Sequence, residues 1–565
     1  MRNSRWIMLI AVGALLTPIL EGCGGVNGSS SGATSYAATT TNSNTTGGTP
    51  NSGSKGITQG PARGADSTNE SPPTSPPFWI PLAESPQSGA TGNNGVYVIP
   101  GDAISSAPVV LTPATTNATL LAVAKEAQSS RPGVAMYYAT GPDNLVHIYG
   151  INLAGSANLP TVTQIGSLSL DPASGNRICR ADTAQRDKSD PSTLFVVLEI
   201  TNTPGPLPCG IGGTFELVNF TDSPTTTPIA LPYWSLNMRN IYGPDGKLGG
   251  VVTFNASGQV VFYPADQLAG PATVVVSTAY AFGLVASSND AVYINVTPNS
   301  SSTGQDVYKV THSGVSSLVY TSQGSLGSAT TDTNNLYLSD TRANIVSTLV
   351  QISLQTDNVQ SLYTLNTSGG ASVLGSTGSS LIIGYSAPNG DTTISTLPLN
   401  VSSPQPSVLA SVPGTYFMSA FLDPSATYVY VNYSTTFNYT EPGTAVFAVG
   451  TGQQLQMSSH SKFMQGEGSN VILLTDVALS YDIGGATVYN FDPTAATQTP
   501  LRLADGTPYT IPQGMAWVSA FSMGDVGAIN LQSATGGPVT AGAVYDASTH
   551  VIVPISPSNT SVSIW

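Results

Sequence analysis

Charged residues are scarce in this chain of 565 residues, because Asp, Glu, Lys and Arg together make up only 8% of it. Glutamate is rare and long runs of Ala, Glu, Lys and Leu are missing, so little of the sequence favours α-helix. Residues 119–127 (TLLAVAKEA) could form a short helix or equally a strand. So few charges over so long a chain also suggest an exported protein that hydroxyl and amide groups keep soluble.

Basic residues are the scarcer sign: 16 Lys and Arg stand against 31 Asp and Glu, which gives a formal net charge of −15. A surface of that sign repels the phosphate backbone of nucleic acids. We therefore do not expect nucleic acid among the partners.

Motifs for metal and phosphate chemistry are also missing. The sequence has no H-E-x-x-H, P-loop or complete EF-hand loop. Asp332-Thr333-Asn334 begins like a calcium loop, but the later ligands and the closing glutamate do not follow. The four histidines are far apart and pair with no Cys, Asp or Glu at ligand spacing: His147, His312, His460 and His550. We interpret them as surface or strand residues and expect no metal site and no cofactor.

What the chain has in abundance is short β-prone runs. Residues Ala279–Leu365 contain two consecutive units, each with four runs rich in Val, Leu, Ile, Tyr and Thr between Asn, Asp, Ser and Gly turns. Tyr293 of the first unit corresponds to Tyr337 of the second, 44 positions later. A four-strand unit that recurs every ~40–50 residues is the pattern of a β-propeller blade.

Similar units follow one another along most of the chain, and a separate hairpin precedes them at Val96–Thr112. We therefore predict an all-β fold, a single β-propeller of about eight four-stranded blades, with seven as the main alternative count. Closure should combine strands from both chain ends in one blade, because closure removes exposed sheet edges. Two stacked β-sandwich domains are the alternative architecture, but they give no reason for a repeat of ~45 residues.

One repeat carries a family resemblance. The run Asn-Asn-Leu-Tyr-Leu-Ser-Asp at Asn334–Asp340 resembles the repeat of bacterial surface-layer-like propellers of the YVTN type. The resemblance covers one or two blades well and the others loosely. It supports the propeller architecture and implies no activity.

The N-terminus has the pattern of an export signal. Arg2 and Arg5 precede an apolar run, Trp6–Leu20, which is shorter than the ~20 residues of a membrane-spanning helix. The run ends in Leu-Glu-Gly-Cys at residues 20–23, which resembles a bacterial lipoprotein signal with Cys23 acylated as the mature N-terminus. An ordinary secretory signal with an unrelated cysteine is the alternative. Gly24 stands where a retaining Asp would keep such a protein on the inner membrane, so the resemblance favours the outer membrane of a Gram-negative-type bacterium.

Three regions follow from this pattern: a signal peptide at 1–22, a linker at 23–77 and the propeller at 78–565. The linker is rich in Gly, Ser, Thr, Asn and Pro and has almost no aliphatic side chains, so we predict a disordered tether. Cys179 and Cys209 remain as a pair in an oxidising compartment. We predict that they form a disulfide; a metal site is the alternative, but no second pair or neighbouring histidine supports it.

One stretch of the body is dense in charge. It comprises Arg177, Arg180, Asp182, Arg186, Asp187, Lys188 and Asp190. Such runs usually form solvated loops, yet in so uncharged a body this one is the best candidate for a contact surface. Two carboxylates in neighbouring predicted strands, Glu199 and Glu216, could instead serve a glycosidase.

We therefore carry two hypotheses of function. The first is a monomeric envelope lipoprotein whose propeller binds or scaffolds a protein or glycan partner, with the membrane contacted through the N-terminal lipid. The second is an exported glycosidase or lyase with a site at the central channel. The first is favoured, because the sequence offers few catalytic candidates.

Overall fold

The computed structural model describes residues 78–564, with gaps at 86–94, 102, 107, 113–115, 126–130, 154–158, 169, 171–176, 202–212, 222–227, 233–237, 278, 299–303, 344, 424, 465–470, 478–481, 524–525, 535–538 and 556–560. The predicted signal peptide at 1–22, Cys23 and the linker at 23–77 therefore lie outside the described residues, and these predictions stay untested.

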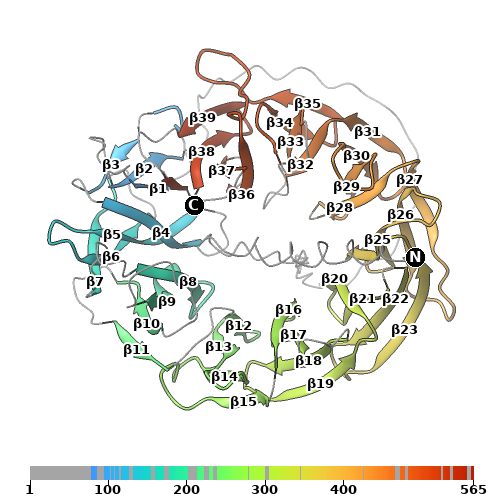
Figure 1. Cartoon of the computed structure of the whole chain (residues 1–565), viewed down its shortest axis with the longest axis horizontal. Helices are drawn as coiled ribbons and strands as arrows, with labels where there is room; N and C mark the ends of the chain where they lie inside the picture. The colour runs from blue at the N-terminus through green and yellow to red at the C-terminus, as the bar shows by residue number, and fades with distance from the viewer. Residues whose placement is uncertain are drawn as a thin grey trace, which may run out of the picture.

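The described residues form ten four-stranded antiparallel sheets, arranged as blades around one axis (Figure 1). We number the blades along the chain and give their strands from the centre of the ring outwards. Blade 1 consists of β40 (Ser561–Ile564), β1 (Trp79–Ser85), β2 (Gly95–Pro100) and β3 (Val109–Val110), and blade 2 consists of β4 (Thr116–Lys125), β5 (Pro132–Thr140), β6 (Val146–Asn152) and β7 (Val162–Leu168). Blade 3 consists of β8 (Arg177–Gln185), β9 (Leu194–Thr201), β10 (Thr214–Asn219) and β11 (Ile229–Leu231), and blade 4 consists of β12 (Arg239–Tyr242), β13 (Leu248–Phe254), β14 (Val260–Pro264) and β15 (Thr273–Val276). Blade 5 consists of β16 (Ala281–Ser287), β17 (Ala291–Thr297), β18 (Asp306–Thr311) and β19 (Ser316–Thr321).

Blade 6 consists of β20 (Ser325–Thr331), β21 (Asn335–Arg342), β22 (Val346–Ser353) and β23 (Val359–Asn366), and blade 7 consists of β24 (Ala371–Ser376), β25 (Ser380–Ser386), β26 (Thr392–Pro398) and β27 (Ser407–Val412). Blade 8 consists of β28 (Tyr416–Leu422), β29 (Tyr428–Ser434), β30 (Pro442–Ala448) and β31 (Gln454–Ser459), and blade 9 consists of β32 (Ser461–Met464), β33 (Val471–Thr475), β34 (Thr487–Asp492) and β35 (Thr497–Pro500). Blade 10 consists of β36 (Met515–Met523), β37 (Val526–Ser533), β38 (Val539–Asp546) and β39 (Val551–Ile555). A single 3-10 turn, η2 (Pro191–Thr193), interrupts the strands of the described part. No helix in that part is long and apolar enough to cross a membrane.

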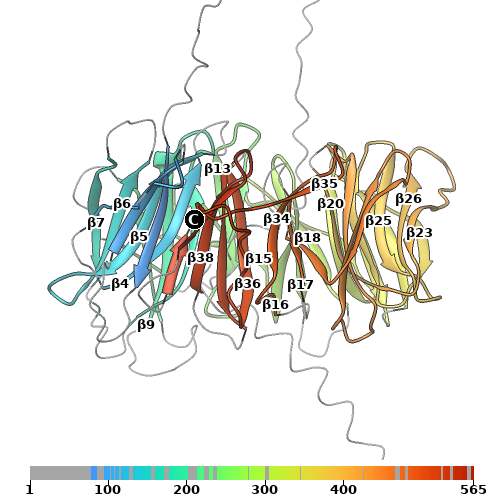
Figure 2. The same cartoon turned by 90° about the horizontal axis from the view of Figure 1, so that it is seen from above.

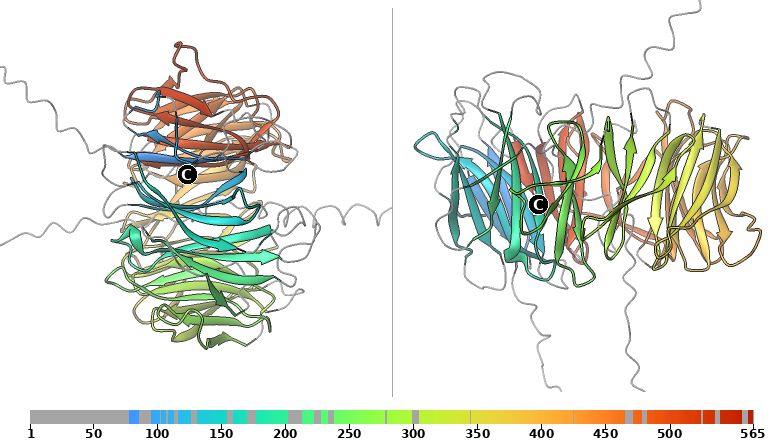
Figure 3. Two further views of the ribbon diagram at one scale, coloured as in Figure 1. Left: turned by 90° about the vertical axis from the view of Figure 1, so that its left-hand side faces the viewer. Right: turned by 90° about the horizontal axis from the view of Figure 1, so that it is seen from below.

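The ring is broad and flat. In Figure 2 it is seen edge-on, and the strands run across its thickness. Figure 3 shows the blades side by side from two further directions. The single-propeller architecture is therefore confirmed, and the alternative of two stacked sandwiches is wrong.

The predicted count of eight blades, with seven as the alternative, is wrong, because the described residues form ten. The hairpin at Val96–Thr112 is part of blade 1, and β40 supplies its innermost strand. Of residues 119–127, left open between helix and strand, the described residues 119–125 belong to β4, the innermost strand of blade 2. Local patterns describe single blades, whereas the number that closes a ring depends on how neighbouring sheets pack.

Both chain ends do meet in one blade, as predicted. β1 pairs antiparallel with β40, and Leu82 stands opposite Ile564 in the register. In Figure 1 the C-terminus accordingly lies beside the innermost strands. Ile564 is 2% exposed, so the last strand is anchored by apolar burial as well as by backbone pairing.

The core lies between blades, where the apolar faces of neighbouring sheets meet. Tyr293 of β17 packs in one cluster with Leu336 and Leu338 of β21. Tyr337 of β21 packs in the next cluster with Ile383 of β25. The two tyrosines that define the sequence repeat are thus equivalent, because each fills the space toward its neighbour blade with a side chain at most 1% exposed.

Several innermost strands share an irregularity. The register shifts between Leu284 and Ala286 in β16, between Val373 and Gly375 in β24, and between Phe417 and Ser419 in β28. Each shift is a β-bulge, which increases the local twist of a strand. A bulge at this place therefore helps these three sheets twist as they approach the axis.

Candidate functional site

The charge-dense stretch divides into parts with different surroundings. Arg177 and Arg180 lie in β8, the innermost strand of blade 3, and both are exposed. Arg180 stands opposite Glu199 of β9 in the register, so the two side chains share one face of the sheet. These two arginines are the exposed members of the predicted contact surface that lie in an innermost strand.

Three other members make contacts to blade 4. Buried Asp182 accepts a hydrogen bond from the Met238 amide at 2.9 Å. Arg186 donates to the Ala265 carbonyl, and its guanidinium lies 5.0 Å from the Phe195 ring centre. Lys188 lies 4.1 Å from the ring centre of Tyr242. These contacts join blades 3 and 4.

The remaining two acids shape the loop between β8 and β9. Asp187 accepts hydrogen bonds from the amide and hydroxyl of Ser189. Asp190 caps η2 by accepting from the Ser192 amide at 2.9 Å. The seven charged residues therefore do not form one uniform surface, and their role in binding stays a prediction.

Only one cysteine of the predicted disulfide lies among the described residues. Cys179 lies in β8. Cys209 is outside the described residues, so the disulfide stays a prediction.

The two carboxylates considered for a glycosidase are held apart by the pleat. Glu199 is opposite Phe215 in the register, and Glu216 is opposite Leu198. Because neighbouring strand residues point to opposite faces, these side chains lie on different faces of blade 3. Glu199 is buried, and burial raises the pKa of half-buried Glu216. They cannot flank one glycosidic bond.

Three of the four histidines lie in separate connections between strands. His460 and His550 adopt left-handed backbone angles, with φ of 51° and 57°. His312 lines a shallow pocket of about 410 Å³ together with Asp245 and Lys247. Its Nδ1 is buried and has no hydrogen-bond partner among the described residues. In the described part of the chain, no three His, Cys, Asp or Glu side chains gather as a metal site.

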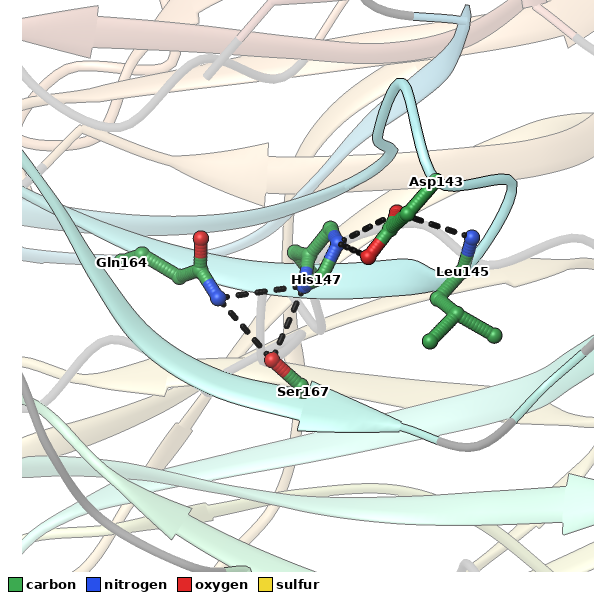
Figure 4. Close-up of polar contacts among 5 residues, drawn as sticks. All are labelled: Asp143, Leu145, His147, Gln164 and Ser167. Atoms are coloured by element: carbon green, nitrogen blue, oxygen red, sulfur yellow. Dashed lines mark hydrogen bonds and ion pairs between the residues drawn. The ribbon is translucent and has the colours of Figure 1, made fainter.

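His147 differs from the other three, because it lies within a polar cluster of blade 2 (Figure 4). Its Nε2 is 2.8 Å from Oδ1 and 3.0 Å from Oδ2 of Asp143. Its Nδ1 is 2.9 Å from Ser167 Oγ and 3.1 Å from Gln164 Nε2. Gln164 Nε2 also donates to Ser167 Oγ at 2.9 Å. We call these four residues the His147 cluster.

Local chain geometry assembles the His147 cluster. The β5–β6 turn contains the turn residues Pro142, Asp143 and Asn144, and Asn144 takes a left-handed φ of 62°. In the pairing of β6 with β7, the register shifts so that Tyr149 faces Gln164 while Ile148 faces Gly166. This bulge brings Gln164 and Ser167 to the same face, although strict alternation would separate side chains three residues apart.

The ring of His147 is enclosed while its hydroxyl partner is open to solvent. His147 is 7% exposed, whereas Ser167 is exposed. A Cβ added at Gly141 would lie 2.5 Å from His147 Cδ2, so only glycine fits beside the ring. The hydrogen bond from His147 holds the pKa of Asp143 below its ordinary value. An ionised carboxylate, an imidazole and a hydroxyl thus form one hydrogen-bonded chain.

Sequence reasoning missed this cluster. We interpreted His147 as an ordinary strand or surface residue, and Asp143, Gln164 and Ser167 carried no motif. The Pro-Asp-Asn turn four residues before the histidine was the only available signal. The bulge that brings Ser167 to the imidazole could not be read from the alternation of side chains.

A second feature is an exposed aromatic loop between β29 and β30 of blade 8, residues 435–441. Phe437 in this loop is 73% exposed. Its ring meets Tyr416 edge-on, with ring centres 5.6 Å apart and an interplanar angle of 79°. Tyr416 begins β28 and stands opposite Ser434, so the exposed ring lies at the end of the blade where the innermost strand starts.

Hydrogen bonds hold the aromatic loop in one shape. The Thr435 amide donates to the Glu441 carbonyl at 3.1 Å, which closes the loop. The Thr436 hydroxyl accepts from the Thr440 amide at 3.1 Å, and the Tyr439 amide donates to the Thr436 carbonyl at 3.1 Å. Tyr439 adopts a φ of 58°, which is costly for an aromatic residue. The loop therefore presents an exposed apolar ring on a hydrogen-bonded turn.

Comparison with known proteins identifies no family. No protein-family model and no curated protein matches the sequence. The resemblance of Asn334–Asp340 to YVTN-type repeats accordingly stays a prediction.

Several solved structures are similar to the chain. A eukaryotic initiation factor matches with a TM-score of 0.45 and 10% identity, over 77% of this chain and 97% of that one. Prolyl oligopeptidase B from Galerina marginata matches with a TM-score of 0.35 and 12% identity, over 74% of this chain and 55% of that one. TolB from Acinetobacter baumannii gives 0.28 and 10%, over 57% and 79%. The chain spans about half the length of the oligopeptidase. With TM-scores below 0.5, none of these likenesses supports an argument about function.

Proposed function

We propose that this protein is an envelope-anchored binding module whose ring presents the aromatic loop to a partner protein. The observation that carries the proposal is Phe437, an aromatic side chain 73% exposed at the tip of a hydrogen-bonded loop. Exposed aromatic groups on preorganised loops are typical of the residues that dominate binding energy at protein interfaces.

The chemistry of the loop favours a protein over a glycan. The phenyl ring of Phe437 has no hydrogen-bonding group, so its burial requires an apolar pocket on the partner. Its edge-on contact with Tyr416 fixes the ring before binding, which lowers the entropy lost on association. The two carboxylates considered for a glycosidase lie on opposite faces of a sheet, which is evidence against the enzymatic alternative.

The test is recovery of a partner from detergent-solubilised envelopes with the full-length protein as bait. Phe437→Ala should reduce retention about 30-fold or more, because hot-spot truncation costs roughly 2 kcal/mol or more. Val315→Ala is the matched control, since Val315 is also an exposed apolar residue in a strand connection, 65% exposed, in blade 5. Both variants should melt like the wild-type protein.

Two results would overturn this binding mode. Equal recovery by Phe437→Ala and Val315→Ala would remove the aromatic loop from the interface. Loss of recovery after enzymatic removal of glycans from the extract, with protein partners left intact, would assign the ligand to glycan instead.

The anchor is a separate part of the proposal, supported by the resemblance of residues 1–23 to a lipoprotein signal. Cys23→Ser should release the protein from the membrane fraction or stall its processing, because the lipid is attached through that sulfur. Fractionation before and after a high-salt wash measures this. Continued membrane association of the variant after the wash would contradict lipid anchoring.

A further inference from the structure

We propose that Ser167 is an activated nucleophile for acyl transfer, with His147 as its general base and Asp143 as the residue that positions the base. This site is independent of the aromatic loop. It lies in blade 2, whereas the loop belongs to blade 8. The substrate class is an activated ester with a small acyl group.

The hydrogen bonds determine which ring nitrogen carries the proton. Asp143 is a carboxylate, so it accepts, and His147 Nε2 at 2.8 Å must donate to it. In a neutral imidazole the other nitrogen is then an acceptor. That acceptor, Nδ1, lies 2.9 Å from Ser167 Oγ, within reach of the hydroxyl proton. The acid, base and hydroxyl therefore have the roles of a Ser-His-Asp triad, with the two ring nitrogens exchanged.

Gln164 completes the arrangement. Its amide donates to Ser167 Oγ at 2.9 Å, so it stabilises negative charge as the hydroxyl loses its proton. The same amide lies 3.1 Å from His147 Nδ1, which agrees with an acceptor at that nitrogen. The burial of His147 limits competition by water for the base, while the exposure of Ser167 gives an electrophile access.

The reaction balances without a further reagent. Ser167 Oγ forms a bond to the ester carbonyl carbon while its proton passes to His147 Nδ1. The tetrahedral intermediate then breaks its bond to the alcohol oxygen, and that alcohol takes the proton from Nδ1. The acyl group remains on Ser167 until water attacks its carbonyl carbon and gives a proton to His147 Nδ1. The bond between that carbon and Ser167 Oγ then breaks, Oγ takes the proton back from Nδ1, and the acid is released. Because Ser167 lies on the outermost strand β7, we expect small activated esters to react first.

The experiment compares two serines within the same molecule. The full-length protein is treated with a fluorophosphonate or with p-nitrophenyl acetate, and labelling is followed by peptide mass spectrometry. Ser361 is the internal control, because it is exposed on β23, the outermost strand of blade 6. General base catalysis contributes about 10²–10⁴-fold, so Ser167 should be labelled at least 100-fold faster than Ser361.

Single substitutions test the roles of Ser167, His147 and Asp143 separately. Ser167→Ala should abolish the fast labelling, and His147→Gln should reduce it to the rate of Ser361. Asp143→Asn should slow labelling and change the ¹⁵N chemical shifts of His147, which report the protonated ring nitrogen. A purely structural role for Asp143 would leave those shifts unchanged. Labelling of wild-type Ser167 no faster than that of Ser361 would overturn the proposal, even if a variant failed to fold.

Discussion

At the scale of single residues, buried polar side chains of the second strands connect one blade to the next. Asn432 of β29 accepts from the Phe463 amide at 2.8 Å and donates to the Phe463 carbonyl at 3.3 Å. Asn530 of β37 forms the same pair of bonds with Ile564, at 3.3 and 2.9 Å. Each side-chain amide thus pairs with the backbone of the innermost strand in the following blade.

Asn530 should therefore contribute strongly to ring closure. Asn530→Leu keeps a similar volume but leaves the buried amide and carbonyl of Ile564 without that partner. An unsatisfied buried group costs about 1–3 kcal/mol, so we expect the free energy of unfolding to fall by roughly 2–4 kcal/mol. Denaturant unfolding measures this.

Asn358→Leu is the control for that measurement, because Asn358 is exposed in the turn between β22 and β23. It should change the free energy of unfolding by less than about 0.5 kcal/mol. Equal effects of the two substitutions would mean that the contact between Asn530 and Ile564 does not stabilise closure.

At the scale of elements, the turn between the first and second strands and the tyrosine that follows it form a repeated unit. In blade 6, Asp332 accepts from the amides of Asn334 and Asn335 at 2.8 Å, and Tyr337 Oη donates to its other oxygen at 2.8 Å. The stretch that begins like a calcium loop is therefore a strand turn, as its missing ligands indicated. Tyr293 occupies the equivalent position in blade 5, but its buried hydroxyl has no hydrogen-bond partner among the described residues.

These tyrosines predict how stability depends on alkaline pH. Burial, together with nearby carboxylates, raises the pKa of Tyr293, Tyr337 and Tyr430 far above the ordinary value of 10.0. A tyrosine whose pKa is higher in the folded than in the unfolded state contributes its full stabilisation below the pKa of the unfolded state. This stabilisation is lost as the pH rises from the pKa of the unfolded state through that of the folded state. We expect cooperative unfolding above pH about 10, with tyrosinate absorbance appearing together with the loss of β-sheet circular dichroism.

Two substitutions test this account. Tyr293→Phe removes a hydroxyl without a partner, so it should leave stability at neutral pH nearly unchanged and raise the pH of unfolding. Tyr337→Phe should raise that pH too, but at a cost of about 1 kcal/mol at neutral pH, because the bond to Asp332 is lost. Ionisation of buried tyrosines in a protein that stays folded would contradict the expected coupling.

The sequence predicted the repeated strand pattern of the blades, but it did not predict the number of blades or the local side-chain arrangements at turns and bulges. The spacing of Tyr293 and Tyr337 reports a repeated packing position, so the propeller could be predicted from it. The exposed loop around Phe437 left no signal, because a turn sequence does not state how far its side chains project. The His147 cluster depends on a bulge in β7, and a bulge changes faces without a distinct residue pattern.

At the scale of the whole molecule, stability depends on the closing strand. Every blade packs on two neighbours, so a closed ring of ten has no terminal blade. The pairing of β40 with β1 joins the two ends of the described residues in one sheet, and the hydrogen bond from Asn530 connects Ile564 to blade 10. The sequence did not predict β40, because a strand of four residues is too short to show a clear alternation of apolar and polar side chains.

Removing residues 556–565 should therefore weaken the entire ring. The deletion exposes the edge of β1 and the apolar residues that pack against Ile564, so we expect a loss of at least about 3 kcal/mol in the free energy of unfolding. The exposed edge should also promote association of the protein. Thermal unfolding and sedimentation velocity measure the two effects. A synthetic peptide of residues 556–565 should restore both by adding β40 in trans, whereas a scrambled peptide should not. An unchanged melting temperature in the truncated chain would show that the ring does not need this strand to stay closed.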